Sequence, residues 1–373
     1  MTADAPVTAA ELTGRTLRFD ELVPDTAAFL DTRIPGSEKK INYPLIGPGV
    51  SENATQVVPV SAPHGFNLGA AAMPAGTVNN LHLHYTAEVF FCFGGPWTFR
   101  WGADGTDGTA TVRDGDVISI PTWIFRGFTS ESDGAFLFTA LGRDVSGGLI
   151  WAPSVIAESA RYGMHLTTDH RLIETAPGEV PAGVELVAPL SAADLAGIRS
   201  VSVDEMRTRL TTPADLVWHD DALLDAALPG GGARLALVIG YGLAESRRAV
   251  PRLTEPHGFS VAWLQAEPGR GVNRHRHDDA QALIVRSGRW RVTLNEGDAE
   301  VGTEIGPFDT LSVPAGAWRR LESVGDEAGR LILLTAGEGR TRIEWAPDVV
   351  AAARAAGVAL DPNGYRAPAH LLP

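Results

Sequence analysis

The sequence predicts an all-β protein built from two tandem antiparallel sandwiches or barrels, with a few short helices. The first observation behind this prediction is an internal duplication. Residues 62–84 read APHGFNLGAAAMPAGTVNNLHLH and residues 255–277 read EPHGFSVAWLQAEPGRGVNRHRH, so equivalent positions lie 193 residues apart. The second is a series of short apolar segments, separated by Gly, Pro and Asp, that recurs in both copies and is typical of sandwiches and barrels.

The predicted strands are rich in β-branched and aromatic residues. In the first copy they are VFFCF, WTFRWG, TATVR and VISIP, and in the second they are ALIVRSG, WRVTLN, TLSVP and RLILLTA. The duplication extends through these segments, because a Gly, a Trp, an Asp, a Pro and an Arg recur at matching places. These pairs are Gly95 and Gly288, Trp97 and Trp290, Asp116 and Asp309, Pro121 and Pro314, and Arg126 and Arg319.

Each copy closes with a segment that predicts a helix. WAPSVIAESARYG begins at Trp151 and WAPDVVAAARAAG at Trp345, each with a proline suited to the first turn and apolar residues at 3–4 spacing. Between the copies, Ser191 is expected to cap a short helix. We therefore expect an N-terminal domain of residues 1–165, a connecting segment of residues 166–215 and a C-terminal domain of residues 216–373.

Composition excludes several classes of protein. The net charge of −14 argues against non-specific binding to nucleic acid or to anionic membranes. No apolar run approaches the roughly 20 residues of a membrane span, and the first residues lack the pattern of a secretion signal. The single cysteine, Cys92, fits a reducing cytoplasm, where we expect the protein to reside, and a buried structural thiol is its expected role.

Two histidines spaced by two residues are the clearest functional signal. On a β-strand, His82 and His84 point to the same face, as a chelating pair requires. Glu88 can reach the same point if the chain stays extended or turns into a neighbouring strand, and a carboxylate beside a metal-bound substrate can also act as a general base. Two imidazoles and one carboxylate leave the other side of a metal open, which suits non-haem Fe(II) with substrate and O2.

These residues resemble the first motif of the cupin family at every defined position, Gly76-(x)5-His82-x-His84-(x)3-Glu88-(x)6-Gly95. Because the motif is duplicated, the chain resembles a bicupin over nearly all of its length. The resemblance implies two tandem cupin barrels, each a double-stranded β-helix or jelly roll. Cupins usually take a further histidine ligand from a second motif, but here Trp123 replaces the glycine of that motif and Arg126 replaces the histidine.

The second copy departs further from the family pattern. It keeps His275 and His277, but Gln281 replaces the glutamate and Arg319 again replaces the histidine. Loss of the carboxylate removes a negative charge opposite a divalent cation, which should weaken metal binding. We therefore expect a catalytic N-terminal site and a second site, formed by His275, His277 and Gln281, that is weakly metallated or empty.

The resemblance implies a metal-dependent oxidoreductase, distantly like the gentisate- and quercetin-type dioxygenases. We expect a non-haem Fe(II) dioxygenase that acts with O2 on a small oxygenated aromatic or enediol substrate. Mn, Ni or Zn stay open, because the ligand set does not choose the metal. A non-redox metal-dependent isomerase or lyase and a non-catalytic small-molecule-binding or storage bicupin are the alternatives. Assembly into a homo-oligomer is also open.

Further positions have both a functional and a structural interpretation. Arg126 can bind a substrate carboxylate or enolate through its guanidinium, or it can pair with the motif glutamate. Trp123 can form the wall of a pocket for a flat substrate, and Phe90 can line that pocket or belong to the core. His64 and its counterpart His257 can add a metal ligand or form a hydrogen bond within a turn that opens a strand.

Overall fold

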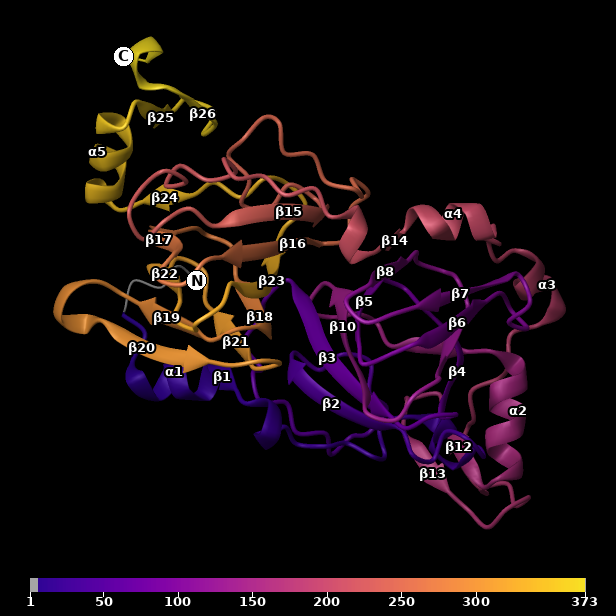
Figure 1. The fold of residues 1–373 in the computed structure, drawn as a ribbon. Coiled ribbons are helices and arrows are strands. Elements are labelled where there is room, and N and C mark those ends of the chain that lie inside the picture. Colours follow the sequence, from indigo (N-terminus) through magenta and orange to yellow (C-terminus); the bar gives the residue numbers. More distant parts are fainter. Residues whose placement is uncertain (1–5, 373) are drawn as a thin grey trace. The chain divides into compact units, whose positions relative to one another are not determined.

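The structure, a computed structural model, describes residues 6–372 and contains two units of the same architecture. The first barrel consists of residues 23–215. The second barrel consists of residues 216–372 together with the N-terminal residues 6–22. Figure 1 shows that both are built mainly from strands, with short helices at the periphery. The predicted all-β class with two tandem barrels is confirmed.

Two antiparallel sheets form the first barrel, with strand orders β14-β8-β5-β10-β3-β2 and β11-β4-β9-β6-β7. Between β4 and β5 the chain passes from the smaller sheet to the larger one. The strands are β2 (Ile41–Ile46), β3 (Phe66–Met73), β4 (Val78–His84), β5 (Glu88–Phe93), β6 (Trp97–Trp101), β7 (Gly108–Val112), β8 (Val117–Ile120), β9 (Arg126–Ser130), β10 (Ala135–Gly142), β11 (Leu149–Trp151) and β14 (Leu210–Thr211).

The second barrel repeats this plan, with sheets ordered β1-β21-β18-β23-β16-β15 and β20-β19-β22-β17-β24. Its strands match those of the first barrel one for one. They are β1 (Thr16–Leu17), β15 (Arg234–Ile239), β16 (Phe259–Ala266), β17 (Gly271–Arg276), β18 (Gln281–Ser287), β19 (Trp290–Leu294), β20 (Val301–Ile305), β21 (Thr310–Val313), β22 (Arg319–Ser323), β23 (Gly329–Ala336) and β24 (Glu344–Trp345).

Alternate side chains along the strands fill the interior of each barrel. On β6, Trp97, Phe99 and Trp101 are fully buried, and the residues between them are only partly buried. This two-residue period is the geometry of a strand with one face on the core. β19 repeats the pattern in the second barrel. The aromatic and β-branched segments of the sequence therefore fold as predicted.

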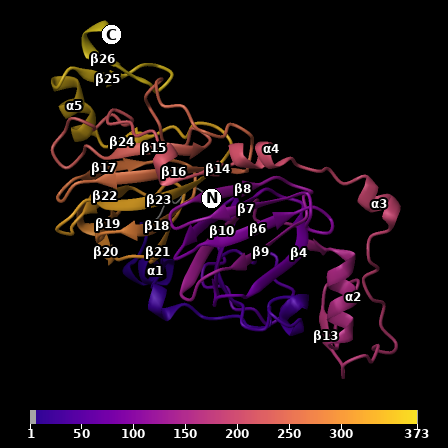
Figure 2. The same cartoon turned by 45° about the vertical axis from the view of Figure 1, so that its right-hand side comes forward.

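The helices lie outside the sheets. The two predicted closing helices are confirmed as α2 (Pro153–Arg161) and α5 (Pro347–Ala355), each followed by a hairpin, β12 (Met164–Leu166) with β13 (Leu172–Glu174) and β25 (Val358–Leu360) with β26 (Arg366–Pro368). Figure 2 shows α2 beside the β13 end of its hairpin. Ser191 caps α3 (Ala192–Ala196) as expected, through a capping box with Asp194. Residues 6–372 also contain five single-turn 3-10 helices, η1 (Phe19–Glu21), η2 (Leu30–Arg33), η3 (Pro213–Asp215), η4 (Gly297–Ala299) and η5 (Ala369–Leu371).

Two equivalent arms cover one edge of the larger sheet in each barrel. α1 (Ala9–Arg15) leads into β1, which pairs with β21 of the second barrel. α4 (Val203–Thr208) leads into β14, which lies just before the second repeat in the sequence. β14 nevertheless pairs with β8 of the first barrel. Arg15 donates to the Ser312 hydroxyl at 2.9 Å and Arg209 donates to the Ser119 hydroxyl at 3.2 Å, so the arms make matching contacts.

These arms correct two of the expected domain boundaries. Residues 6–22 belong to the second barrel and not to an N-terminal domain of residues 1–165. Residues 166–215 are part of the first barrel and not a separate connecting segment. The physical reason is that the edge strand of a sheet has unpaired N–H and C=O groups, which a further short strand can pair with. A strand of two residues is too short to leave a periodic pattern in the sequence.

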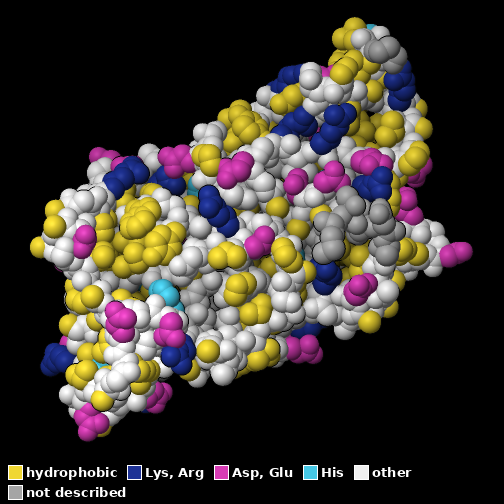
Figure 3. Space-filling model, turned by 180° about the vertical axis from the view of Figure 1, so that it is seen from behind, with side chains coloured by type: hydrophobic (Ala, Val, Ile, Leu, Met, Phe, Trp, Pro, Cys, Tyr) yellow, Lys and Arg dark blue, Asp and Glu magenta, His cyan; other side chains and the backbone are white. Residues whose placement is uncertain are grey.

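On the face drawn in Figure 3, basic and acidic side chains are interspersed, without a broad basic area among the described residues. The absence of nucleic-acid binding stays an expectation. Within residues 6–372, none of the helices has the length and apolar character needed to cross a lipid bilayer.

Candidate metal centre

Two histidine rings on β4 converge inside the first barrel. The buried rings of His82 and His84 lie 4.9 Å apart between centroids, at 73° to one another. The Nδ1 atom of His82 is 2.7 Å from the Asn80 carbonyl oxygen, and that of His84 is 3.2 Å from the Gly148 carbonyl oxygen. A ring nitrogen that faces a carbonyl oxygen must carry the hydrogen, so Nε2 of each neutral ring keeps its lone pair for a ligand. Burial, followed by the charge of Arg126, lowers the pKa of His82 well below its ordinary value.

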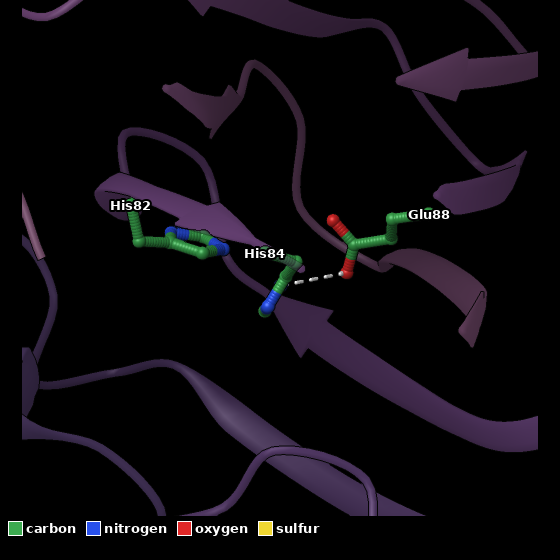
Figure 4. Close-up of side chains that lie close together, drawn as sticks. All are labelled: His82, His84 and Glu88. Atoms are coloured by element: carbon green, nitrogen blue, oxygen red, sulfur yellow. Dashed lines mark ion pairs between the residues drawn. The ribbon is translucent and has the colours of Figure 1, made fainter. Parts of the chain in front are cut away.

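Glu88 brings a carboxylate to the same point from the other sheet. It is the first residue of β5, and its Oε1 atom lies 3.6 Å from His84 Nε2 (Figure 4). The Thr139 hydroxyl on β10 donates to the same oxygen at 3.0 Å. Burial by itself raises the pKa of the Glu88 carboxyl, and the hydrogen bond from Thr139 opposes that rise. The chain thus turns into a neighbouring strand, one of the two routes by which the sequence allowed Glu88 to join the histidines.

The guanidinium of Arg126 holds this carboxylate in place. Its Nε and Nη2 atoms donate to Glu88 Oε2 at 2.9 and 2.5 Å, and Nη1 donates to the carbonyl oxygens of His82 and Ile124. These contacts favour the carboxylate form of Glu88, so we describe the pair as ionic. Arg126 is 1% exposed, and its hydrogen-bonding groups are directed to the protein. The structure thus places it as the ion-pair partner of Glu88, one of the two roles that the sequence left open, and its role as a clamp on the substrate stays a prediction.

The donor set fits a divalent metal ion. The ligand atoms of His82, His84 and Glu88 all lie within 4.8 Å of one another, and within residues 6–372 no other group of three such side chains meets this criterion. His84 Nε2 is buried and has no hydrogen-bond partner, which a structural histidine would need. Two imidazoles and one carboxylate are a common ligand set for Mn, Fe and Zn.

A cavity of about 100 Å³ opens beside these three residues. All of the residues that line it belong to the first barrel, and they include Phe90 and Trp151 as well as His82, His84 and Glu88. The placement of Phe90 agrees with its expected contact with a substrate, although the residue also packs in the core.

Trp123, the other expected wall of a pocket, does not line this cavity. Its side chain is 46% exposed and packs edge-on against Tyr85 at the surface, with 5.4 Å between ring centroids. The residue has a φ of 59°, in the left-handed region that a glycine would adopt easily. The prediction that Trp123 lies against the substrate is therefore wrong for this cavity.

The second barrel has a different arrangement at the equivalent point. Arg319 donates through Nη1 to His277 Nε2 at 3.0 Å and to Gln281 Oε1 at 3.3 Å. The rings of His275 and His277 are 6.2 Å apart between centroids and at 28°, so they do not converge as the first pair does. Burial lowers the pKa of Arg319 to about 9, and burial together with that arginine lowers the pKa of His275 to about 3. A guanidinium therefore uses the nitrogen that His277 would offer to a metal.

A glutamate–tryptophan pair supports the first histidine in each barrel, and the sequence did not assign it a role. Trp151 packs on His82 with 5.5 Å between ring centroids, and its Nε1 donates to Glu52 at 2.8 Å. Trp345 packs on His275 at 5.4 Å, and its Nε1 donates to Glu245 at 2.8 Å. The signal was present, because these residues recur in both copies, but nothing local connected positions about 100 residues apart.

Three other positions have structural roles. His64 and His257 each direct Nδ1 to a backbone carbonyl oxygen two residues earlier at 2.7 Å, as expected for a turn that opens a strand, and neither joins the group of converging ligand atoms. Cys92 is fully buried in the core of the first barrel, and burial raises the pKa of its thiol. Of the alternatives, the structural interpretation holds for all three.

Comparisons with known proteins agree with this architecture. Residues 262–335, in the second barrel, match the family model of the Cupin domain. The chain is similar to the oxalate decarboxylase of Lactobacillus farciminis in its formate complex, with 13% identity and a TM-score of 0.55 over 91% of this chain and 90% of that one. It is also similar to Bacillus subtilis oxalate decarboxylase at pH 4.6, with 13% identity and a TM-score of 0.53 over 96% of this chain and 85% of that one.

A further structure of the Bacillus subtilis enzyme, studied for its Mn(II) centres, has 15% identity and a TM-score of 0.52 over 89% of this chain and 79% of that one. No curated protein sequence matches the chain. At these identities the similarity establishes the fold, and it does not extend to the finer likeness to gentisate- and quercetin-type dioxygenases, which stays a prediction. The chain has the fold of two tandem cupin barrels.

Proposed function

We propose that the first barrel is the active site of a metal-dependent enzyme that carries out a non-redox, lyase-type reaction on a small oxygenated molecule. His82, His84 and Glu88 would hold the cation. The observation that carries the proposal is that ligand atoms of these three residues lie within 4.8 Å of one another, with the unpartnered Nε2 of His84 buried beside the carboxylate of Glu88 at the wall of a cavity. The lyase class is favoured because the similar solved structures are oxalate decarboxylases.

The residues of the chain have distinct tasks in this proposal. A bound divalent cation would supply Lewis acidity that polarises a substrate oxygen. Arg126 fixes the direction of the Glu88 carboxylate, and Trp151 packs on the ring of His82. The mainly apolar walls of the cavity would limit the access of water to the reacting atoms, and fewer water molecules strengthen the electrostatic interactions there.

The metal is proposed to be Mn(II), because one of the similar structures was studied for its Mn(II) centres. Fe(II), Ni and Zn remain compatible with two imidazoles and a carboxylate, since affinity for such a set follows the general order of divalent metals.

A non-haem Fe(II) dioxygenase is the second candidate, and one observation favours it. Arg126 occupies the position of the usual further histidine, so the chain offers three ligands at this point and leaves several metal positions open. Open positions are what a reaction of substrate with O2 requires. A storage or binding bicupin would need no such positions.

Metal analysis of matched variants tests the proposal. Protein purified without a metal-affinity tag is analysed by ICP-MS as wild type, as His84→Ala and as His277→Ala. We expect about one metal per chain in the wild type and in His277→Ala, and none in His84→Ala. Equal metal content in all three would contradict the assignment. Consumption of O2 during turnover would shift the reaction to the dioxygenase class, and a metal that is retained without any turnover would favour the binding protein.

A further inference from the structure

The walls of the first barrel's cavity are mainly apolar. Phe29, Leu68, Phe90, Leu137, Leu141 and Trp151 are among the lining residues. Glu88 is the one acidic side chain in the lining, and neither a lysine nor an arginine is among the described residues that line it. The chemistry of the wall thus favours a ligand with an apolar body.

Two buried cations contact the lining, but both are paired inside the protein. Arg126 gives two hydrogen bonds to Glu88. Lys40 Nζ lies 2.7 and 2.9 Å from the two carboxylate oxygens of Asp31, and it donates to the Asn79 side-chain oxygen at 2.8 Å. These three contacts use all three ammonium hydrogens of Lys40. The charge of Arg126 is paired with Glu88, and neither cation is among the residues that line the cavity, so neither compensates a carboxylate of a bound molecule.

The charges around the proposed metal also indicate the charge of its ligand. The guanidinium of Arg126 balances the carboxylate of Glu88 at 2.5 Å, and both histidines are neutral as ligands. A divalent cation held there would keep two uncompensated positive charges, which attract an anionic oxygen donor. A second negative group farther along the same molecule would lie against apolar walls without a partner, and burial of an unpaired charge is costly.

Asn42 brings an unpartnered neutral donor to the lining of the cavity. The side-chain amide nitrogen of Asn42, on β2, is a buried atom without a hydrogen-bond partner, and Asn42 is a lining residue. A neutral N–H group suits a carbonyl or hydroxyl oxygen and does not compensate a full negative charge. Asn42 can thus add a polar contact with a bound molecule, but it does not change which charge of that molecule the cavity favours.

We infer that the cavity takes a monoanionic oxygen chelator with an apolar body, and that it discriminates against molecules that carry a second carboxylate away from the chelating end. This inference rests on the proposed function, because the chelating end needs the metal. It narrows the substrate class from small oxygenated molecules in general to those with one anionic head and an apolar tail.

Two 2-oxo acids with the same chelating head provide the test. 2-Oxoglutarate ends in a carboxylate, and 5-methyl-2-oxohexanoate carries an isopropyl group of similar shape at the same place. Metal content is measured first on the Mn(II)-loaded protein, and binding of each acid is then measured by calorimetry. We expect the isopropyl compound to bind at least 10-fold more tightly. Equal or tighter binding of 2-oxoglutarate, or binding of neither acid to the metal-loaded protein, would overturn the inference.

The metal measurement separates the two levels of failure. Protein that takes up no metal overturns the proposed function, whereas metal-loaded protein with the wrong preference overturns only the substrate class. Gln56, a partly exposed lining residue, offers a matched pair of variants. Gln56→Arg would add a cation to the lining and should reduce the ratio of the two affinities, 5-methyl-2-oxohexanoate over 2-oxoglutarate, at least threefold. Gln56→Met adds no charge and should leave this ratio unchanged. An unchanged ratio in Gln56→Arg would contradict the inference that the lack of a cation in the lining disfavours a second carboxylate.

Discussion

Arg126 donates two hydrogen bonds to a single oxygen of Glu88, Oε2, at 2.9 and 2.5 Å. The other oxygen, Oε1, is left facing His84. In the second barrel, where Gln281 replaces the glutamate, the equivalent Arg319 donates instead to His277. The same residue type thus orients a carboxylate in one barrel and donates to a histidine nitrogen in the other, and the two barrels differ at this point by a glutamate in place of a glutamine.

Loss of the Arg126 guanidinium should destabilise the metal-free first barrel. Arg126→Gln leaves the Glu88 carboxylate buried without its partner, and removal of one member of a buried pair costs about 3–5 kcal/mol. Bound Mn(II) should recover part of this loss, because the cation supplies a new positive charge beside the carboxylate. Urea unfolding with and without Mn(II) measures both effects.

Arg319→Gln is the control for that experiment. Arg319 hydrogen-bonds to uncharged groups, His277, Gln281 and backbone carbonyls, so its loss leaves no carboxylate without a partner. We expect a smaller loss of stability and no added protection by Mn(II). Equal losses in the two variants would contradict the ionic description of the Arg126–Glu88 pair.

A carboxylate at position 281 should open a metal site in the second barrel. In Gln281→Glu, the new carboxylate should draw Arg319 away from His277, as Glu88 holds Arg126 away from the histidines. His275 and His277 would then both have a free nitrogen. Equilibrium dialysis against Mn(II) should show about two metals per chain in the variant and about one in the wild type. A stoichiometry of one in both proteins would show that Arg319 blocks the site by itself.

The tryptophan that packs on the first histidine of each pair should affect metal binding in the first barrel only. Trp151→Phe removes the indole N–H that donates to the buried Glu52, which should cost about 1–3 kcal/mol of stability, and it loosens the packing on His82. Trp345→Phe removes the matching bond to Glu245. We expect similar losses of stability in both variants, but a raised Mn(II) dissociation constant only in Trp151→Phe. A rise of the constant in both variants, or in neither, is the outcome that this account does not allow.

Much of this architecture could be predicted from the sequence, because duplication and strand patterns are local signals. His82 and His84 were assigned to one face from their spacing alone. The spacing alone does not locate Glu88, because a turn follows His84 and only the fold shows that β5 begins at this residue. The Glu52–Trp151 pair needed the fold entirely, since its members lie about 100 residues apart.

Arg126 shows a second limit of sequence reasoning. The motif places an arginine at a ligand position, and its retention in both copies favours an internal role without excluding a clamp on the substrate. The distances show the internal ion pair, because the guanidinium is buried against Glu88. The arms at β1 and β14 show a third limit, since the pairing of an edge strand is a tertiary choice that two residues cannot encode.

The two buried glutamates beside the tryptophans should make stability depend on pH. Burial raises the pKa of Glu52 from 4.5 to about 7 and that of Glu245 from 4.5 to about 8. At a pH between the pKa of the unfolded chain and that of the folded chain, these carboxyls are protonated in the folded protein and ionised in the unfolded one. The stability that these two groups contribute is therefore fully present below about pH 4.5. The free energy of unfolding then falls as the pH rises toward 7–8, by up to about 1.4 kcal/mol per pH unit for each group.

Urea unfolding of the metal-free protein at pH 5 and pH 8 measures this dependence. We expect lower stability at pH 8 and a flatter profile in the double variant Glu52→Gln, Glu245→Gln, since an amide does not titrate. Glutamine keeps one oxygen that can accept from the tryptophan. A wild-type profile that rises with pH, or one that the double variant leaves unchanged, would show that these carboxyls do not carry protons in the folded state.

The central claim is that one barrel binds the metal and the other replaces it with an arginine. Crystals of the wild-type protein grown with Mn(II), with diffraction data collected for the anomalous signal of manganese, test this claim most directly. We predict one strong anomalous peak per chain, in contact with His82 Nε2, His84 Nε2 and Glu88 Oε1, and none beside His275 and His277. A peak in the second barrel, or an empty first barrel, would contradict the account.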